Sequence, residues 1–289
     1  MDTRSKRARR LGRSVLPAAA WLVTALLVAS AAPPVSAEPA GRAVHPGQLY
    51  WIFYKEDIER VNRFDPAIVQ QLVAGPGTYA LTRSPHGPKL PPGVIPVENF
   101  FSAASIAQAI STGQIFPGVK AVAEDPEDWR ATPVPERLTP IRYMKQFSSS
   151  AASRGLMPIL VPARDLMRVK DAACDQTPSQ TISQAYITCG IPQAAAGARM
   201  FVIQSAAVET NLPQLRQLVR QAAAQARKAN PKVIVLATLS AAPNGTAVPT
   251  SALTQAANAV LPYVQGFEMN SEPENDREAV SFLRSLGLP

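Results

Sequence analysis

Short apolar runs alternate along the chain with longer segments in which apolar residues recur at helical spacing. Many of the runs are apolar at consecutive positions, as in PILV and VIVLA, which is typical of parallel strands covered on both faces. The runs predict strands at residues 49–54, 79–82, 94–98, 120–125, 157–163, 200–206, 233–240 and 266–270. With crossovers between them, they predict an α/β fold, a TIM-like (β/α)8 barrel or a variant lacking one unit. No glycine-rich first turn supports the alternative, an open doubly wound sheet.

Boundary signals mark helices between these strands. Asp65 and Thr139 each place a capping residue ahead of a proline at the first helical position. Ser102 predicts a third helix start by the same capping preference. Segments with an apolar face opposite a polar one predict further helices at residues 211–230, 250–261 and 276–286.

The amino terminus has the features of an export signal. Six basic residues precede an uncharged run over residues 14–37, and Val35, Ser36 and Ala37 fit a cleavage site. The pattern predicts a signal peptide at 1–37, a flexible leader at 38–46 and one barrel domain at 47–289, secreted without a stable membrane anchor. A retained anchor is the alternative, because the run approaches a membrane-spanning length.

Removal of the signal changes the charge of the chain. Residues 1–37 hold six of the 29 basic and one of the 21 acidic residues, so the mature chain carries 23 minus 20, or +3. A charge this small gives little reason to expect a nucleic-acid partner. The roughly 250 remaining residues are a typical length for a (β/α)8 barrel.

The chain has two cysteines and two histidines. In an exported protein, Cys174 and Cys189 are expected to form a disulfide, worth about 3 kcal/mol in the chain-entropy model, and two separate buried thiols are the alternative. His45 and His86 lack partners at ligand spacing, so no metal site is predicted. The sequence also lacks a nucleophile elbow and a phosphate-binding glycine loop, and no cofactor is predicted.

Acidic and amide residues stand at several of the predicted strand ends, where a (β/α)8 barrel forms its active face. Paired carboxylates at this rim suit glycoside hydrolysis, in which one carboxyl group donates a proton and another acts as nucleophile or base. An aromatic side chain beside them can stack against a sugar ring. The predicted catalytic residues are Asp125, Glu127 and Glu268, and the predicted substrate contacts are Glu98, Glu124, Trp129, Gln204 and Asn270.

The acids after residue 124 also have a structural interpretation. Asp125 and Glu127 flank a proline, and an Asp-Pro turn can cap the helical segment that follows it. In that case the two carboxylates would meet Arg130 or Arg137 rather than a substrate.

The other candidates have structural alternatives too. Glu268 lies between apolar neighbours, where a charge is costly to bury unless it is paired, and a salt bridge with Arg164 would pair it. Gln204 and Asn270 can serve by hydrogen-bonding the backbone at strand ends. Trp129 can act as a packing lid.

Three sequence segments also carry a family resemblance. The motif D-P-E-x-W at 125–129, followed by Thr132 and Pro133, the segment VIPV at 94–97 and the segment FVIQ at 201–204 resemble an uncharacterised family of secreted actinobacterial proteins. The resemblance spans most of the mature chain and implies a glycoside-hydrolase-type (β/α)8 barrel, without an established activity. Glu124 departs from the family pattern, in which a tyrosine is expected before the aspartate.

Two functions follow from this site. The first is hydrolysis of an extracellular carbohydrate or cell-wall polymer by the paired carboxylates, and the second is binding of such a polymer without catalysis. A third class, an exported structural protein, predicts a barrel rim filled with apolar side chains. The sequence leaves the oligomeric state open.

Overall fold

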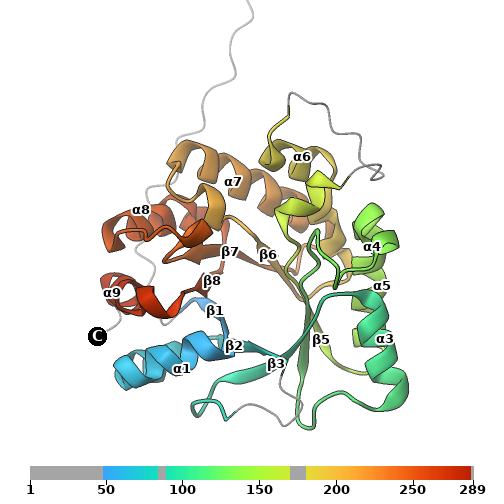
Figure 1. The fold of residues 1–289 in the computed structure, drawn as a ribbon, viewed down its shortest axis with the longest axis horizontal. Coiled ribbons are helices and arrows are strands. Elements are labelled where there is room, and N and C mark those ends of the chain that lie inside the picture. Colours follow the sequence, from blue (N-terminus) through green and yellow to red (C-terminus); the bar gives the residue numbers. More distant parts are fainter. Residues whose placement is uncertain (1–47, 84–88, 170–179, 288–289) are drawn as a thin grey trace, which may run out of the picture. The chain divides into compact units, whose positions relative to one another are not determined.

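The computed structural model describes residues 48–83, 89–169 and 180–287, in which eight parallel strands form a closed barrel in chain order (Figure 1). The prediction of a TIM-like (β/α)8 barrel is confirmed, and all eight strands are present. The strands are β1 (Tyr50–Tyr54), β2 (Gly77–Thr82), β3 (Ile95–Phe100), β4 (Ala121–Glu124), β5 (Met157–Leu160), β6 (Met200–Ile203), β7 (Ile234–Ser240) and β8 (Gly266–Asn270).

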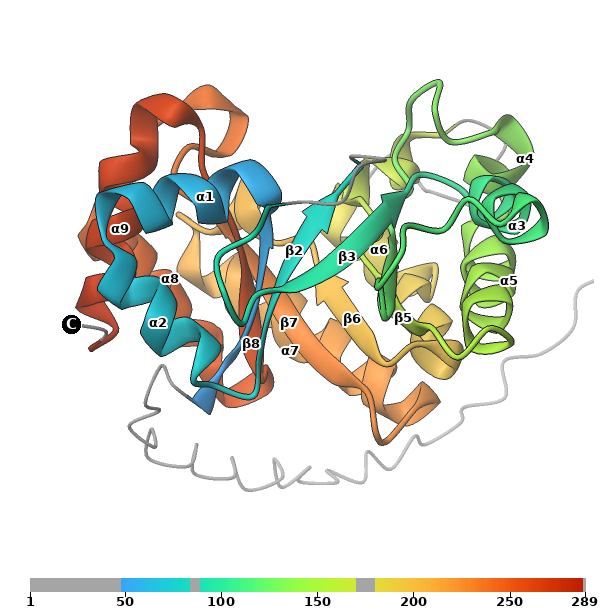
Figure 2. The ribbon, with the colours of Figure 1, turned by 90° about the horizontal axis from the view of Figure 1, so that it is seen from below.

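Helices surround the strands on the outside of the barrel. They are α1 (Lys55–Phe64), α2 (Pro66–Val73), α3 (Ala103–Thr112), α4 (Val134–Leu138), α5 (Pro140–Ala152), α6 (Ile182–Thr188), α7 (Leu212–Ala229), α8 (Thr250–Val260) and α9 (Asp276–Ser285). Figure 2 shows α1, α2, α8 and α9 on one side of the strands and α3 and α5 on the other. Among the described residues, no helix lies between β2 and β3.

The predicted caps form at several helix starts. Asp65 accepts a hydrogen bond from the Ala67 amide at α2, and Ser102 accepts one from the Ser105 amide at α3. Thr139 precedes α5 without forming a side-chain cap. The sequence patterns did not predict α1, α4 or α6, of which α1 begins directly after β1 without a side-chain cap.

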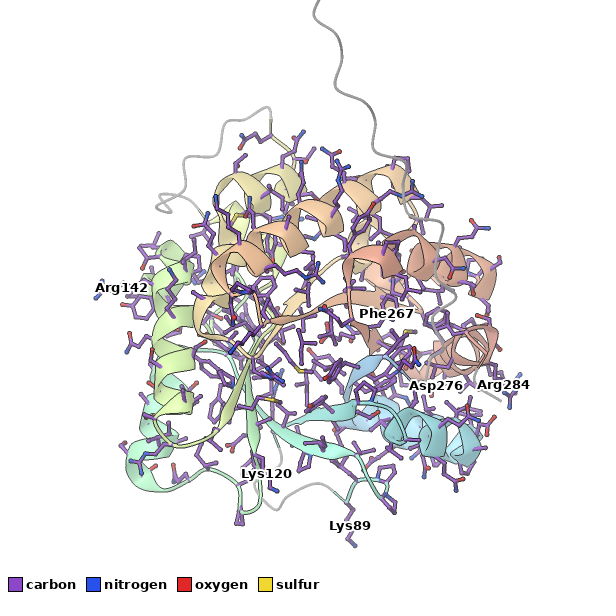
Figure 3. All side chains as sticks on the ribbon, turned by 180° about the vertical axis from the view of Figure 1, so that it is seen from behind. Lys89, Lys120, Arg142, Phe267, Asp276 and Arg284 are labelled. Atoms are coloured by element: carbon purple, nitrogen blue, oxygen red, sulfur yellow. The ribbon has the colours of Figure 1, made fainter. Side chains whose placement is uncertain are left out.

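Apolar side chains form two layers. The inner one fills the barrel and includes Ile52, Leu81 and Val202, while the outer one lies between strands and helices and includes Trp51 and Phe267. Because successive side chains point to opposite faces of a strand, each strand needs apolar residues on both sides. In Figure 3, Phe267 lies in the interior, whereas exposed charged residues extend from the edge: Lys89, Lys120, Arg142 and Arg284.

The barrel closes where β8 pairs with β1. Gly266 lies opposite Tyr50 in the register of these strands, and a Cβ atom at position 266 would lie 1.9 Å from the backbone oxygen of Tyr50. This is far inside the van der Waals contact distance of two non-bonded atoms. Glycine at this position is therefore needed for the two strands to approach.

A buried ion-pair network supports the carboxyl end of β8. Arg60, on α1, lies 2.6 Å from Asp57 Oδ1 and 2.8 Å from Asp276 Oδ1, and its Nη2 donates a hydrogen bond to the backbone oxygen of Ser271 at 2.7 Å. Ser271 directly follows β8. The network therefore joins α1, α9 and the end of the strand that carries Glu268.

Several predicted features lie outside the described residues: the signal peptide at 1–37, the leader at 38–46 and Cys174. The pairing of Cys174 with Cys189 therefore stays a prediction. Within the described part of the chain, no helix combines the length and apolar character needed to cross a bilayer.

Candidate active site

Asp125 lies at the carboxyl-terminal mouth of the barrel. It directly follows β4, on the face of the strand whose preceding members, Ala121 and Ala123, belong to the inner apolar layer. Tyr54, at the end of β1, donates a hydrogen bond from its hydroxyl to Asp125 Oδ2 at 3.1 Å. Gln204, just after β6, donates from Nε2 to Asp125 Oδ1 at 3.3 Å. Side chains from three strand ends therefore meet across the mouth.

The surroundings of Asp125 tune its acidity. Its burial raises the pKa to about 6, while the hydrogen bond from Tyr54 and the positive charge of Arg83 oppose the rise, because both favour the ionised form. Asp125 is thus the most acidic of the three predicted catalytic carboxyl groups.

Glu268 enters the same region from β8. Thr238 Oγ1, on β7, donates a hydrogen bond to Glu268 Oε2 at 2.5 Å, and the backbone oxygen of Thr238 accepts one from Ser205 Oγ at 2.6 Å. Burial raises the pKa of Glu268 to about 8, the bond from Thr238 opposes this, and the charge of Asp125 adds to it. The alternative salt bridge with Arg164 does not form, because Arg164 Nη1 donates to Ser183 Oγ at 2.7 Å instead.

Glu127 is the most accessible of the three carboxyl groups. Its backbone amide donates to Thr132 Oγ1 at 3.1 Å, and its side chain is partly exposed. Burial raises its pKa to about 7, the charges of Asp125 and Asp165 raise it further, and that of Arg83 opposes them. The charge of Asp125 thus raises the pKa of both Glu127 and Glu268, and the charge of Glu127 also raises that of Glu268.

Asp125 and Glu127 do not form the alternative ion pairs with Arg130 or Arg137. Arg137 Nη1 lies 2.6 Å from Asp128 Oδ1, so the neighbouring aspartate takes this cation. In the described part of the chain, no ion pair involves Asp125 or Glu127. The two acids are therefore not held in a structural salt bridge.

A cavity of about 430 Å³ opens over the ends of β5 to β8. Its lining includes Glu127, Asp165, Gln204, Ser240, Asn270 and Glu272. Asp125 and Glu268 have relative exposures of 0% and 1%, so they lie beneath this surface. A larger cavity of about 880 Å³, beside α5, contains none of the three predicted catalytic residues in its lining.

Glu98 and Glu124 point away from the barrel mouth, which corrects the expectation that they contact a substrate there. Val97 belongs to the inner apolar layer and Val122 to the outer one, so side-chain alternation turns both glutamates outward. Glu98 Oε2 accepts a hydrogen bond from the Phe116 amide at 2.9 Å. Burial in the outer layer raises the pKa of Glu124 well above its usual value.

Aromatic side chains form part of the rim. Trp129 is 37% exposed and meets Phe101 edge to face, with ring centroids 4.6 Å apart. The Arg83 guanidinium carbon lies 3.7 Å from the Phe101 ring centroid, within cation–π range. Trp129 therefore packs on one side and remains open to a ligand on the other.

Sequence reasoning missed Tyr54, Arg83 and Thr238 as parts of this site. Tyr54 could have been found from strand parity, since it lies two positions after the inward-facing Ile52. The other two become visible only when the strand ends are placed around one mouth. Across the described segments, no group of three or more His, Cys, Asp or Glu side chains is arranged to hold a metal ion.

No known family model matches the sequence, and neither does any curated protein. Among solved structures, the chain is similar to a GH128 (subgroup III) curdlan-specific exo-beta-1,3-glucanase from Blastomyces gilchristii, at 13% identity and a TM-score of 0.44, covering 78% of this chain and 90% of that one. It is also similar to the carboxyl transferase domain of Rhizobium etli pyruvate carboxylase, at 8% identity and a TM-score of 0.43, covering 83% and 47%. These two names describe different activities, so the comparisons do not identify a reaction.

The elevated pKa of Glu268 predicts a pH-dependent stability difference for Glu268→Gln. The folded pKa of about 8 exceeds the unfolded value of about 4.3, so this group's contribution to stability is present below the unfolded pKa and lost as pH rises towards 8. Glutamine cannot ionise. We expect the variant to match the wild type at about pH 4, below the unfolded pKa, and to exceed it near pH 9 by about 2 kcal/mol or more, in denaturant unfolding.

Glu59→Gln is the matched control for this measurement. Glu59 lies on α1 and pairs with Lys55 at 3.5 Å on the surface, so the same change there should leave the pH dependence of unfolding unaltered. Wild-type and Glu268→Gln curves that run parallel from about pH 4 to pH 9 would contradict the assignment of a proton to Glu268.

Proposed function

We propose that the protein is a glycoside hydrolase that acts on an extracellular carbohydrate or cell-wall polymer. The observation that carries this proposal is the group of three carboxyl side chains at the barrel mouth, whose pKa values are raised to about 6, 7 and 8, with Glu127 facing an open cavity. Carboxyl groups whose acidities differ at one site are what acid-assisted glycoside cleavage requires.

Glu127 takes the role of general acid. With a pKa of about 7 it retains its proton over much of the neutral range and can donate it to the leaving oxygen of a glycosidic bond. It is also the only one of the three whose side chain is partly exposed onto the cavity. The charge of Asp125 contributes to its high pKa and so helps keep the proton in place.

Asp125 and Glu268 act from beneath the cavity. Asp125, with the lowest pKa of the three, is ionised at neutral pH and held by Tyr54 and Gln204, so its fixed negative charge stabilises the positive charge that develops on the sugar. Glu268 holds a proton at the same pH. Its neutrality limits repulsion between carboxylates at the mouth.

The rim around the carboxyl groups suits a sugar ligand. Trp129 is 37% exposed and packs against Phe101, and the face of an exposed aromatic ring can stack against a sugar. Gln204 and Asn270 line the cavity with amide groups that can exchange hydrogen bonds with hydroxyls. The export signal predicted at 1–37 would bring this site to polymers outside the cell.

Incubation of the secreted chain with a panel of purified polysaccharides tests the proposal. The expected result is release of new reducing ends from at least one polymer, detected by a reducing-sugar assay and resolved by chromatography. Absence of cleavage across neutral and acidic polysaccharides, by a chain shown to be folded, would contradict it.

Binding without catalysis is the competing function, and one observation favours it. Asp125 and Glu268 have almost no exposed surface, so a ligand in the cavity touches neither of them directly unless the rim rearranges. A pure binding protein would retain polysaccharide in a pull-down assay and release no new ends. The two assays together separate the candidates.

A further inference from the structure

Two arginines that follow β5 line the cavity beside the acidic residues. Arg164 and Arg168 are the first and last residues of the short 3-10 helix Arg164–Arg168, and both line the cavity that contains Glu127. In the described residues, neither guanidinium forms an ion pair, although Arg60, Arg137 and Arg284 do. Two positive charges thus line the cavity, and no carboxylate among the described residues is ion-paired with either of them.

Holding these arginines together is costly for the free protein. Burial lowers the pKa of Arg164, the nearby charge of Arg168 lowers it further, and Tyr186 opposes the change. Arg164 is held in place by its bond to Ser183 Oγ at 2.7 Å. An arranged but unpaired cation in a cavity is typical of a site in which a ligand supplies the opposite charge.

The acid nearest in sequence does not supply that charge. Asp165 lies between the two arginines, but its Oδ1 accepts a hydrogen bond from the Asp128 amide at 3.2 Å, and its charge raises the pKa of Glu127. The carboxylate is therefore turned towards the loop that holds the general acid. The lining therefore holds three acids, Glu127, Asp165 and Glu272, beside the two arginines, and no ion pair joins any of these acids to Arg164 or Arg168 among the described residues.

We propose that Arg164 and Arg168 bind the carboxylate of a uronic acid residue, so that the protein acts on an acidic glycan. The planar guanidinium forms two parallel hydrogen bonds with a planar carboxylate, a geometry that neutral sugars cannot use. A uronate in this position lies beside the sugar whose glycosidic bond faces Glu127. The binding of a uronate rests only on the two arginines in the cavity lining. The cleavage of an acidic glycan rests also on the proposed hydrolase function.

Calorimetric titration with matched ligands tests the binding step. The probes are oligosaccharides of galacturonate, glucuronate and mannuronate, each paired with its methyl ester, and Glu127→Gln is the background that prevents turnover. For at least one of these sugars, the free acid is expected to bind about tenfold or more tightly than the ester, because the ester removes one charge-assisted pair.

Arg168→Gln and Arg220→Gln make the matched variants. Arg168 is exposed on the cavity wall, and Arg220 is exposed on α7 outside the cavity lining, so each substitution removes one surface charge. Arg168→Gln is expected to reduce the preference for the acid to about twofold or less, whereas Arg220→Gln should leave it unchanged. Arg164→Lys, which keeps the charge but loses the planar fork, should weaken acid binding without affecting the ester.

The outcomes separate the two proposals. Equal binding of acid and ester, or an acid preference that survives Arg168→Gln, would overturn the uronate assignment. Equally tight binding of sulfated neutral oligosaccharides would overturn it too, in favour of a general anion site. Arginine-dependent binding of uronates that the wild type never cleaves would support the uronate site and contradict the hydrolase function. Cleavage of neutral glycans alone would support the hydrolase function and contradict the uronate site.

Discussion

Replacement of Glu127 with glutamine is expected to lower kcat on a cleaved polysaccharide by about 100- to 10,000-fold, the usual contribution of a general acid. Glutamine keeps the shape of the side chain and removes its proton-donating carboxyl group. Because Glu127 is partly exposed and forms no ion pair within the described residues, the substitution should leave the fold intact. Initial rates of reducing-end release, with far-UV circular dichroism to verify folding, provide the measurement.

The pH profile distinguishes loss of an acid from general damage. Wild-type activity should fall as pH rises through about 7, where Glu127 loses its proton, and as pH falls through about 6, where Asp125 gains one. The two limbs belong to a coupled group, so they report apparent values. Residual activity of Glu127→Gln should lack the alkaline limb. Retention of that limb, or of wild-type kcat, would assign the acid to another residue, and Glu59→Gln should behave as wild type.

Gly266→Ala is expected to cause the largest loss of stability of any single methyl addition in the strands. The new Cβ would lie 1.9 Å from the Tyr50 backbone oxygen and 2.7 Å from its carbonyl carbon, and backbone atoms in a barrel cannot move aside cheaply. We expect a loss of about 4 kcal/mol or more, which for a domain of this size lowers Tm by about 8 to 16 °C. Differential scanning calorimetry measures the shift, and failure to accumulate folded protein agrees with it.

Gly113→Ala is the control for this prediction. Gly113 ends α3 with φ of 68°, and a Cβ there meets nothing within 4 Å, so the substitution adds only backbone strain. The expected loss is about 1 kcal/mol. If Gly266→Ala were no more destabilising than Gly113→Ala, the closure of the barrel would not depend on the close approach of β8 to β1.

Several parts of the fold could be read from local sequence. Eight strands were predicted because strands buried on both faces need apolar residues at consecutive positions, as in the runs that became β5 and β7. Asp65 and Ser102 marked helix starts because their side chains satisfy free backbone amides. By contrast, α1 begins directly after β1 without a capping side chain, so its start carried no local signal.

The candidate site shows where sequence reasoning stops. The three predicted catalytic residues Asp125, Glu127 and Glu268 are brought together, since parallel strands deliver their carboxyl ends to one rim. The same rule placed Glu98 and Glu124 there wrongly, because it ignores which face of the strand a residue occupies. A shift of one position turns a side chain from the barrel mouth to the helix layer.

The sequence by itself determined the order of strands and crossovers and the presence of acids at the strand ends, because apolar patterning and capping act over a few neighbouring residues. Only the tertiary structure decided which acids share a site, since the contact between Tyr54 and Asp125 joins residues 71 positions apart. It also decided their acidity, because burial and the charge of distant residues set a pKa. Those quantities depend on distances in space, which no local pattern encodes.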